Sequence, residues 1–481
     1  MLMAPELIVV VTAFLLLFAD LFAGGQRRRF LAVMALIGLG MACAVTVALM
    51  PSGGIMLGGR FSVSAVAWWF KLLFLGSAIL TVAMSMDALD GRAAVPSGLG
   101  SRGEYYMVLL LTVSGMMFLA SATDIVTLYV SLELATIPLF ILTAWKRDAL
   151  SGEAGLKYVI MGALASSLLI YGLGILYGLT GHMDFAGIRS ALSASSPAFW
   201  LAVALITAGV GFKMTIVPFH MWAAEVYQGA PTPITAYISV ASKCAGLMLL
   251  FQLFLNVMGR FIGDLTVMFA VLAAVTMTLG NVVAIVQNNI KRFMAFSAIS
   301  QAGYVLMGFL SPGEGGVPAM VYYMLIYMFT NMAVFAVIVL HTNETGLEDI
   351  KDYRGLSRTN PVLALAMMIA LFGLAGIPPL AGFVGKFFLF SIASKAGFHW
   401  LVALAAVNST ISLFYYLRIV RQMYIEPVAE GAKPLSVSPI LTVTIGATAL
   451  ASTVLGIIPF FYEIIHAQTA GSLALLLWPP A

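Results

Sequence analysis

The chain has 481 residues, of which 62% are hydrophobic and 9% are charged, and its formal net charge is +4. A soluble globular protein carries about 25% charged residues, so this composition excludes a water-soluble fold and indicates a protein embedded in lipid. The small net charge argues against a nucleic-acid partner. The two cysteines, Cys43 and Cys244, lie far apart in apolar segments, which excludes a thiolate-rich metal or iron–sulfur site.

Apolar runs bounded by charges, proline and glycine predict the membrane spans in chain order. A helix needs about 20 apolar residues to cross a hydrocarbon core of about 30 Å. The runs are continuous and do not alternate, which favours helices over a β-barrel. The prediction is an all-α polytopic membrane protein of about 14 transmembrane helices. The predicted spans are 5–23, 30–50, 64–86, 104–120, 124–145, 156–180, 199–221, 232–257, 261–287, 293–311, 317–341, 361–393, 398–424 and 439–465.

The distribution of lysine and arginine predicts the topology of these spans. When the loops are assigned alternately to the two sides, sixteen basic residues fall on one side, four on the other and four inside spans. The basic side of a membrane protein is normally cytoplasmic, so we expect both termini on the outer side. No soluble domain is evident. We therefore expect a single membrane domain over 1–481, with the first three helices in 1–90 and the last helix at 439–465.

Four of the charged residues inside spans stand out, because an ionisable side chain near the bilayer centre costs at least ~2.5–3.5 kcal/mol and is a functional candidate by default. They are Glu133, Lys213, Lys243 and Lys386. Pro138 and Pro218 each follow a charge by five residues, and Pro378–Pro379 precede Lys386. Because proline removes a backbone hydrogen bond, we expect Glu133, Lys213 and Lys386 beside broken helices, and Lys243 near the middle of its span. Broken helices in membranes are where transporters hold ions.

A proton switch is the chemistry that these residue types suggest. Burial disfavours a charged lysine, whereas a nearby carboxylate favours it. A lysine that approaches and leaves Glu133 would therefore bind and release a proton, and Lys213, Lys243 and Lys386 could form a relay. The alternative is a static buried ion pair that only fixes helix packing. His220, seven residues after Lys213, is a further relay candidate, and Lys157 and Lys291 could line an access path or serve as interfacial anchors. Lys71 could reach the interface from within its span.

The positions of the broken helices indicate an internal repeat. Lys213 and Lys386 are 173 residues apart, and the same shift moves Glu133 into the tenth span and Lys243 into the thirteenth. Spans four to eight (104–257) therefore map onto spans nine to thirteen (261–424), with the broken helices as spans seven and twelve. Because five is an odd number of crossings, the second copy should be inverted, as in inverted-repeat transporters.

Three stretches carry a resemblance to a known family. They are FKMTIVPFHMWAAEVYQGAPTPITAYISVASK, NNIKRFMAFSAISQAGYVLMG and DYRGLSRTNPVLALAMMIALFGLAGIPPLAGFVGKF. They resemble the antiporter-like membrane subunits of proton-pumping NADH:quinone oxidoreductase, respiratory complex I. The VYQGAPTP form and the following SVASK stretch resemble the N type among these subunits, and the resemblance covers nearly the whole chain.

The resemblance implies a proton-translocating subunit in a bacterial inner membrane, with both termini periplasmic. It implies that Glu133 and Lys213 form the switch, that Lys243 connects the two halves, and that Lys386 leads to the far side. It also implies that NADH, flavin and iron–sulfur clusters are bound in partner subunits, with no cofactor in this chain. Its partners would be other complex I membrane subunits, including a neighbouring antiporter-like subunit, and the lipid bilayer. The alternatives are a subunit of a multisubunit sodium/proton antiporter and a purely structural membrane subunit.

Overall fold

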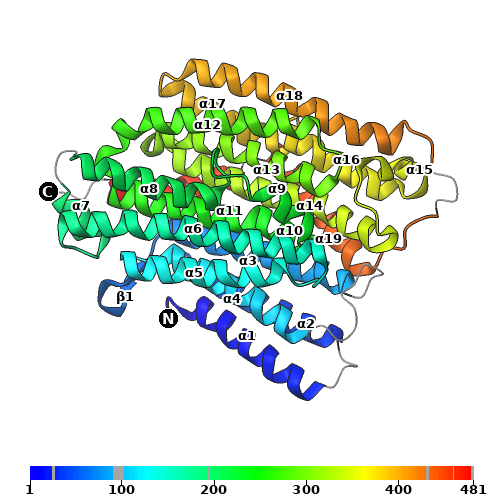
Figure 1. The fold of residues 1–481 in the computed structure, drawn as a ribbon, viewed down its shortest axis with the longest axis horizontal. Helices are drawn as coiled ribbons and strands as arrows, with labels where there is room; N and C mark the ends of the chain where they lie inside the picture. Colours follow the sequence, from blue (N-terminus) through cyan, green and yellow to red (C-terminus); the bar gives the residue numbers. More distant parts are fainter. Residues whose placement is uncertain (24–27, 90–101, 193–195, 429–432, 459, 478–481) are drawn as a thin grey trace.

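The computed structural model describes residues 1–23, 28–89, 102–192, 196–428, 433–458 and 460–477. Its long helices run side by side in one bundle, with α1 along one edge and α18 along the opposite edge (Figure 1). The N-terminus, β1 and α7 lie at one end of the bundle, and α15 lies at the other end. The all-helical architecture predicted from the sequence is confirmed. Arg27 and Arg92, two of the basic residues that predicted the topology, lie outside the described residues.

The N-terminal part contains four long helices and a small hairpin. The elements are α1 Ala4–Ala23, α2 Arg28–Leu49, β1 Gly54–Met56, η2 Leu57–Gly59, β2 Phe61–Val63, α3 Ala65–Ala88 and α4 Arg102–Ser121. Strands β1 and β2 pair antiparallel, with Ile55 opposite Ser62. This hairpin was not predicted, because two strands of three residues carry too little pattern to detect.

The middle part contains the first broken helix and a helix with π-helical segments. Its elements are α5 Ile125–Thr143, α6 Ala149–Thr180, α7 Phe185–Ala191, α8 Pro197–Met214, α9 Ala223–Gly229, α10 Thr232–Tyr237, η3 Ile238–Ser242, α11 Lys243–Leu250, η4 Phe251–Val257 and η5 Gly259–Phe261. The segments η3 and η4 are π-helical, and together with α10 and α11 they form one continuous span, helix 232–257.

The C-terminal part contains the second broken helix. Its elements are α12 Ile262–Ile285, α13 Ile290–Leu306, η6 Met307–Leu310, η7 Pro312–Gly316, α14 Val317–Thr345, η8 Ile350–Tyr353, α15 Leu356–Thr359, α16 Pro361–Ala375, α17 Ala381–Lys395, α18 His399–Tyr424, α19 Pro439–Ile457 and α20 Phe460–Leu477.

The predicted spans agree with these elements, with three corrections. In the described residues, 13 helices are long and apolar enough to cross a membrane, and α16 with α17 supplies the divided twelfth span. The last predicted span ends at Ile457 and not at 465, and the separate helix α20 follows it. Helix α6 begins at Ala149, seven residues before its prediction. Pro138 does not break α5, which is continuous from Ile125 to Thr143.

Three helices form the centre of the bundle. Helix 232–257, the span 290–310 and α14 are almost entirely buried within the protein, whereas α1 and α18 expose most of their surface. A helix that is apolar on all sides must be enclosed by other helices or by lipid. Both broken helices pack against this centre, and their first segments end at the buried residues Met214 and Ala375, whereas the prolines at 218, 378 and 379 are exposed.

The two breaks have the same local structure. Helix α8 ends at Met214, and Thr215 then takes a left-handed conformation with φ of 59°. Helix α16 ends at Ala375, and Gly376 takes the same conformation with φ of 86°. A left-handed residue stops a helix, because its backbone turns away from the helical path. In each segment the peptide bond before a proline, Pro218 or Pro379, is cis.

Close helix contacts recur at a fixed spacing along the chain. A Cβ atom at Gly115 of α4 would lie 2.4 Å from the backbone nitrogen of Ala135 on α5. A Cβ atom at Gly280 of α12 would lie 2.5 Å from the backbone nitrogen of Ser300 on α13. Both members of the second pair lie 165 residues after those of the first. Small residues at such contacts let membrane helices pack closely.

The same spacing relates two short backbone bridges. Asp124 pairs antiparallel with Asp184, and Asn289 pairs antiparallel with Asp349, again 165 residues further along. Asp124 and Asn289 both cap the helix that follows them, α5 and α13 respectively. The structure therefore relates the two halves by 165 residues and not by the predicted 173.

Candidate functional site

Lys213 lies at the C-terminal end of α8, one residue before the break. Its side chain is 3% exposed, and its ammonium group donates a hydrogen bond of 2.7 Å to the hydroxyl of Thr136 on α5. Thr136 stands three residues after Glu133, so the two side chains lie on one face of α5. The ammonium group of Lys213 thus reaches the face of α5 that carries the carboxylate.

Glu133 is half-buried near the middle of α5, and its carboxylate accepts a hydrogen bond of 2.6 Å from the hydroxyl of Ser166 on α6. Within the described residues no ion pair joins Glu133 to Lys213. A cavity of about 10 Å³ is lined by Thr136, Ser166 and Lys213. That volume is close to the smallest that holds one water molecule, so water can connect the two groups.

Lys243 begins α11, directly after the π-helical segment η3. Its side chain is 2% exposed. Its ammonium group lies 3.5 Å from the backbone carbonyl oxygen of Met214 and donates a hydrogen bond to the hydroxyl of Thr215. The end of a helix leaves its last carbonyls without helical partners. Lys243 therefore supplies a donor to a carbonyl that the break in α8 sets free.

Lys386 lies on α17, beyond the second break, and its side chain is 3% exposed. Its ammonium group donates to the carbonyl oxygens of Leu374 at 3.1 Å and Ala375 at 2.9 Å. It also donates to the hydroxyl of Ser409 at 3.0 Å and lies 4.6 Å from the centre of the Tyr304 ring. Free carbonyls and an aromatic face thus hold a cation at this break too.

The two lysines on the broken helices do not occupy equivalent positions. Lys213 precedes the left-handed residue Thr215, whereas Lys386 follows the left-handed residue Gly376. Thr215 and Gly376 are 161 residues apart, four fewer than the 165 residues that relate the helix contacts. The two spacings relate Lys386 to Glu225 or to Met221, and neither relates it to Lys213. The predicted correspondence of Lys213 with Lys386 is therefore wrong, because it paired two lysines from opposite sides of the break.

Polar side chains continue from Lys386 toward the centre of the bundle. Gln301 of α13 donates to the carbonyl oxygen of Leu374 at 3.1 Å, the same oxygen that accepts from Lys386. The hydroxyl of Tyr323 on α14 donates to the amide oxygen of Gln301. The carbonyl at the break is therefore linked to α14 through two neutral side chains.

Buried tyrosines extend this connection toward Lys243, and we call Tyr158, Tyr227, Tyr327 and Tyr323 the tyrosine string. Each lies near the next along this order. Tyr158 lies near Ser242, the residue before Lys243, although neither hydroxyl has a hydrogen-bond partner within the described residues. Within the described residues, the hydroxyls of Tyr227 and Tyr327 have no hydrogen-bond partner. Buried polar groups without protein partners are normally satisfied by ordered water.

The other candidates from the sequence, Lys291, Lys157 and His220, have surroundings that differ from one another. Lys291 is fully buried, forms an ion pair of 2.7 Å with Glu348 and donates to the carbonyl of Ala230 at 3.3 Å. Lys157 is partly exposed and forms ion pairs of 2.7 Å with Glu153 and with Glu225.

His220 is half-buried in the connection between α8 and α9. Its Nδ1 has no partner within the described residues, and no hydrogen bond there joins its ring to Lys213.

The sequence did not predict a buried ion pair that joins α3 to α1. Lys71 on α3 lies 2.7 Å from the carboxylate of Glu6 on α1, and both side chains are fully buried. The lysine ammonium also lies 4.4 Å from the Trp68 ring. Lys71 therefore does not reach the interface as the sequence suggested. Glu6 was missed because it lies third in α1, where a carboxylate is ordinary at the start of a helix.

Among the described residues, no group of three His, Cys, Asp or Glu side chains is placed to hold a metal ion. Cys43 and Cys244 are both free. The candidate site therefore consists of buried lysines, one carboxylate, free carbonyls and neutral hydroxyls. Such groups can pass protons between ammonium groups, hydroxyls and water.

Comparison with known proteins assigns this architecture to a class. The sequence profile of the NADH:quinone oxidoreductase/Mrp antiporter transmembrane family matches residues 122–412. A subunit of respiratory complex I from Thermus thermophilus has the same fold, with a TM-score of 0.80 and 29% identity, over 95% of this chain and 97% of that one. A chain of the Mrp complex from Dietzia sp. DQ12-45-1b shares the fold at a TM-score of 0.83 and 22% identity, over 99% and 98% of the two chains. The fold and the buried lysines thus define an antiporter-like membrane subunit.

Sequence identity then separates the branches of this class. NADH-quinone oxidoreductase subunit N from Moorella thermoacetica is 41% identical over 461 residues, which are 95% of each chain. The chain belongs to the N-subunit family of NADH-quinone oxidoreductase, the membrane subunits of respiratory complex I. It is therefore a multi-pass membrane subunit of a proton-translocating enzyme complex and works together with other subunits of that complex. The resemblance found in the sequence is confirmed.

Proposed function

We propose that this chain carries protons through a relay of Glu133, Lys213, Lys243 and Lys386. The observation that carries the proposal is that the three lysines are 2–3% exposed, yet none forms an ion pair with a carboxylate within the described residues. Removing an unpaired charge from water is costly. Lysines that alternately bind and release a proton fit this environment better than fixed charges do.

The contacts support a defined route. Glu133 connects through Ser166, the small cavity and Thr136 to Lys213. Lys213 is followed in the chain by Met214 and Thr215, and the ammonium group of Lys243 contacts the carbonyl oxygen of Met214 and the hydroxyl of Thr215. From there the tyrosine string and Gln301 lead to the carbonyl that binds Lys386. Lys291, Lys157 and His220 would then line the access paths.

The energy for this transport would come from redox chemistry in partner subunits. NADH, flavin and iron–sulfur clusters would be bound there, and this chain would carry no cofactor. One of its membrane partners would be a neighbouring antiporter-like subunit. The half-buried Glu133 could respond to such a neighbour. A carboxylate near Lys213 favours the protonated lysine, and a charge from the neighbouring subunit would change the strength of this effect.

The fixed spacing of helix contacts supports two repeats, 104–257 and 261–424, flanked by helices 1–90 and 439–465. Five membrane crossings separate α4 from α12, so the second repeat would be inverted. Together with the distribution of basic residues, this arrangement would place both termini on the periplasmic side of a bacterial inner membrane.

The test is to replace Lys213 or Glu133 by Ala in the intact complex. Both variants should assemble, because each change removes a charge from a site without breaking an ion pair. Coupled quinone reduction and proton pumping in vesicles should fall by about tenfold or more, as expected for loss of a proton-transfer group. Lys395→Ala, at the exposed end of α17, is the matched control and should remain active. Normal pumping in both variants would refute the relay.

A further inference from the structure

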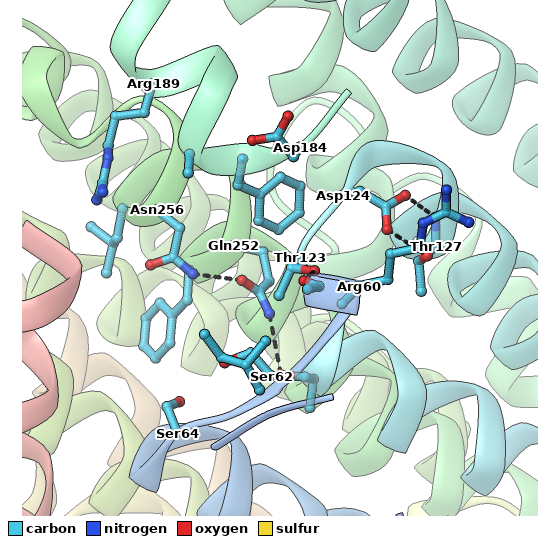
Figure 2. A pocket seen from close by; sticks show the side chains of 18 of the residues that line it. Arg60, Ser62, Ser64, Thr123, Asp124, Thr127, Asp184, Arg189, Gln252 and Asn256 are labelled. Atoms are coloured by element: carbon cyan, nitrogen blue, oxygen red, sulfur yellow. Dashed lines mark hydrogen bonds between the residues drawn. The ribbon is translucent and has the colours of Figure 1, made fainter. Parts of the chain in front are cut away.

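A cavity of about 870 Å³ opens at the end of the bundle that carries β1 and α7. Figure 2 shows Arg60, Asp124, Asp184 and Arg189 around it, with Gln252 projecting from the helix beneath. The loops with Arg60 and Arg189 are on the predicted periplasmic side. The cavity is far larger than the roughly 15 Å³ that one water molecule needs, and its polar rim suits water.

A seam of polar contacts leads inward from the cavity between α4 and helix 232–257. At the cavity, Asn256 donates to the amide oxygen of Gln252 at 2.5 Å, and Gln252 donates to the carbonyl of Ala120 on α4 at 3.2 Å. Further in, the hydroxyl of Thr112 on α4 donates to the hydroxyl of Tyr237 at 2.8 Å. Thr112 lies eight residues before Ala120, about two turns of α4, and Tyr237 lies fifteen residues before Gln252, about four turns of helix 232–257. The same two helices thus carry polar contacts at both ends of the seam.

Sulfur-containing side chains occupy the seam between these contacts. Met248 lines the cavity, and Cys244 stands one turn further in on the same helical face. The hydroxyl of Tyr237 lies 3.7 Å from the sulfur of Met116. Cys244 stands seven residues after Tyr237, on the same face of helix 232–257, and lies near Tyr327 of α14. Methionine is flexible and fills gaps without rigid packing, so about two turns of movable side chains separate the cavity from buried hydroxyls.

We propose that this cavity is a water-filled vestibule that connects the tyrosine string to the periplasmic side along the seam between α4 and helix 232–257. Lys243 points to another side of the same helix, toward Met214, and so lies away from the seam. Cys244 lies in the seam and near Tyr327, so the seam meets the relay at Tyr327. From Tyr327, Tyr323 and Gln301 lead to Lys386. The inference rests on the proposed proton relay. It adds a path from the relay to the periplasmic side in the first repeat, and the side chains of Met248 and Cys244 close this path.

The test uses the chemical accessibility of introduced cysteines in the intact complex. The background carries Cys43→Ala and keeps the buried Cys244. Gln252→Cys is compared with Val267→Cys, which lies on the lipid-exposed surface of α12. Gln252 lies seven residues before η5 and Val267 lies six residues after it, so the two positions have similar depths. Right-side-out vesicles are treated with a positively charged, membrane-impermeant methanethiosulfonate, and proton pumping is then measured.

The Gln252→Cys complex should be labelled from the periplasmic side, and the background and Val267→Cys complexes should not. Labelling should then lower proton pumping by about tenfold, because a bulky charge would block the seam. No reaction at Gln252→Cys, or reaction only in inverted vesicles, would overturn the vestibule. Full labelling with unchanged pumping would overturn its role as a proton path. Labelling needs no turnover, so these results are separable from failure of the relay, which the Lys213→Ala variant tests.

Discussion

At the scale of single residues, the carbonyl groups at the broken helices determine where the lysines bind. Lys243 and Lys386 come from different elements, yet each places its ammonium group against backbone oxygens that a helix end has freed. A protonated lysine is stabilised by these partial negative charges, and a neutral lysine is stabilised by the absence of water. The two forms can therefore be close in free energy, which is the condition for a proton carrier.

Replacing Lys386 by Ala tests this balance. The variant removes one donor from each of the carbonyl oxygens of Leu374 and Ala375, which still accept from Gln301 and Ser409 respectively, so the cost stays at or below about 1–3 kcal/mol. That is too little to prevent assembly of a large bundle, whereas pumping should fall by about tenfold or more. Native gels report assembly, and acidification assays on vesicles report pumping. A lost complex with normal pumping in the remainder would instead assign Lys386 a structural role.

The sequence identified the charged members of the site and missed the neutral ones. Lys213, Lys243 and Lys386 are conspicuous because lysine is rare inside an apolar span. Ser166, Thr136 and Gln301 are not conspicuous, because neutral polar residues are common in membrane helices and usually bond to their own backbone. Thr143 of α5, for example, donates only to the carbonyl of Leu139. Only the packing of α5, α6 and α8 distinguishes Ser166 and Thr136 from such residues.

At the scale of elements, a proline alone does not break a helix. Pro138 removes one hydrogen bond, and α5 continues past it. The breaks at Pro218 and Pro379 also contain a left-handed residue, Thr215 or Gly376, which turns the chain out of the helix. The sequence reveals the glycine at position 376, but nothing in it marks Thr215, because threonine rarely adopts this conformation. The sequence therefore predicts the second break from both its glycine and its prolines, and the first break from its proline alone.

Close contacts between neighbouring helices make a second prediction at this scale. Gly280→Ala places a methyl group 2.5 Å from the backbone nitrogen of Ser300, so α12 and α13 must separate. Overpacking of this kind costs about 1–3 kcal/mol or more, and the variant should reduce the amount of assembled complex. Gly174→Ala on α6 has no atom within 4 Å of its new methyl group and is the control. Equal thermal stability of the two variants in detergent would contradict the packing described here.

At the scale of the whole molecule, the chain forms one bundle, and the proposed relay begins at Glu133, close to an exposed face of that bundle. Glu133 is only half-buried, and the face of α5 around it exposes Val126, Val130 and Ile137. An apolar face of this kind suits either lipid or another membrane subunit. The assignment to complex I indicates that other subunits lie beside this chain.

A tag on the N-terminus tests assembly and topology together. On a native gel, the tagged chain should migrate with a large band that oxidises NADH. In right-side-out vesicles the tag should be accessible to an impermeant protease, because both termini are expected on the periplasmic side. Digestion only in inverted vesicles would reverse the topology, and migration apart from NADH oxidation would contradict membership of the complex.

The 165-residue spacing has a consequence for the origin of the chain. Val126 and Thr127 open α5, whereas the matching positions that open α13 are Lys291 and Arg292. Two halves related by five crossings imply an ancestor that was inserted into the membrane in both orientations and paired with itself. After gene fusion, each half had to be fixed in one orientation. Basic residues at the start of α13 would fix that orientation, so membrane insertion gives a reason for Lys291 that is independent of the proposed proton access.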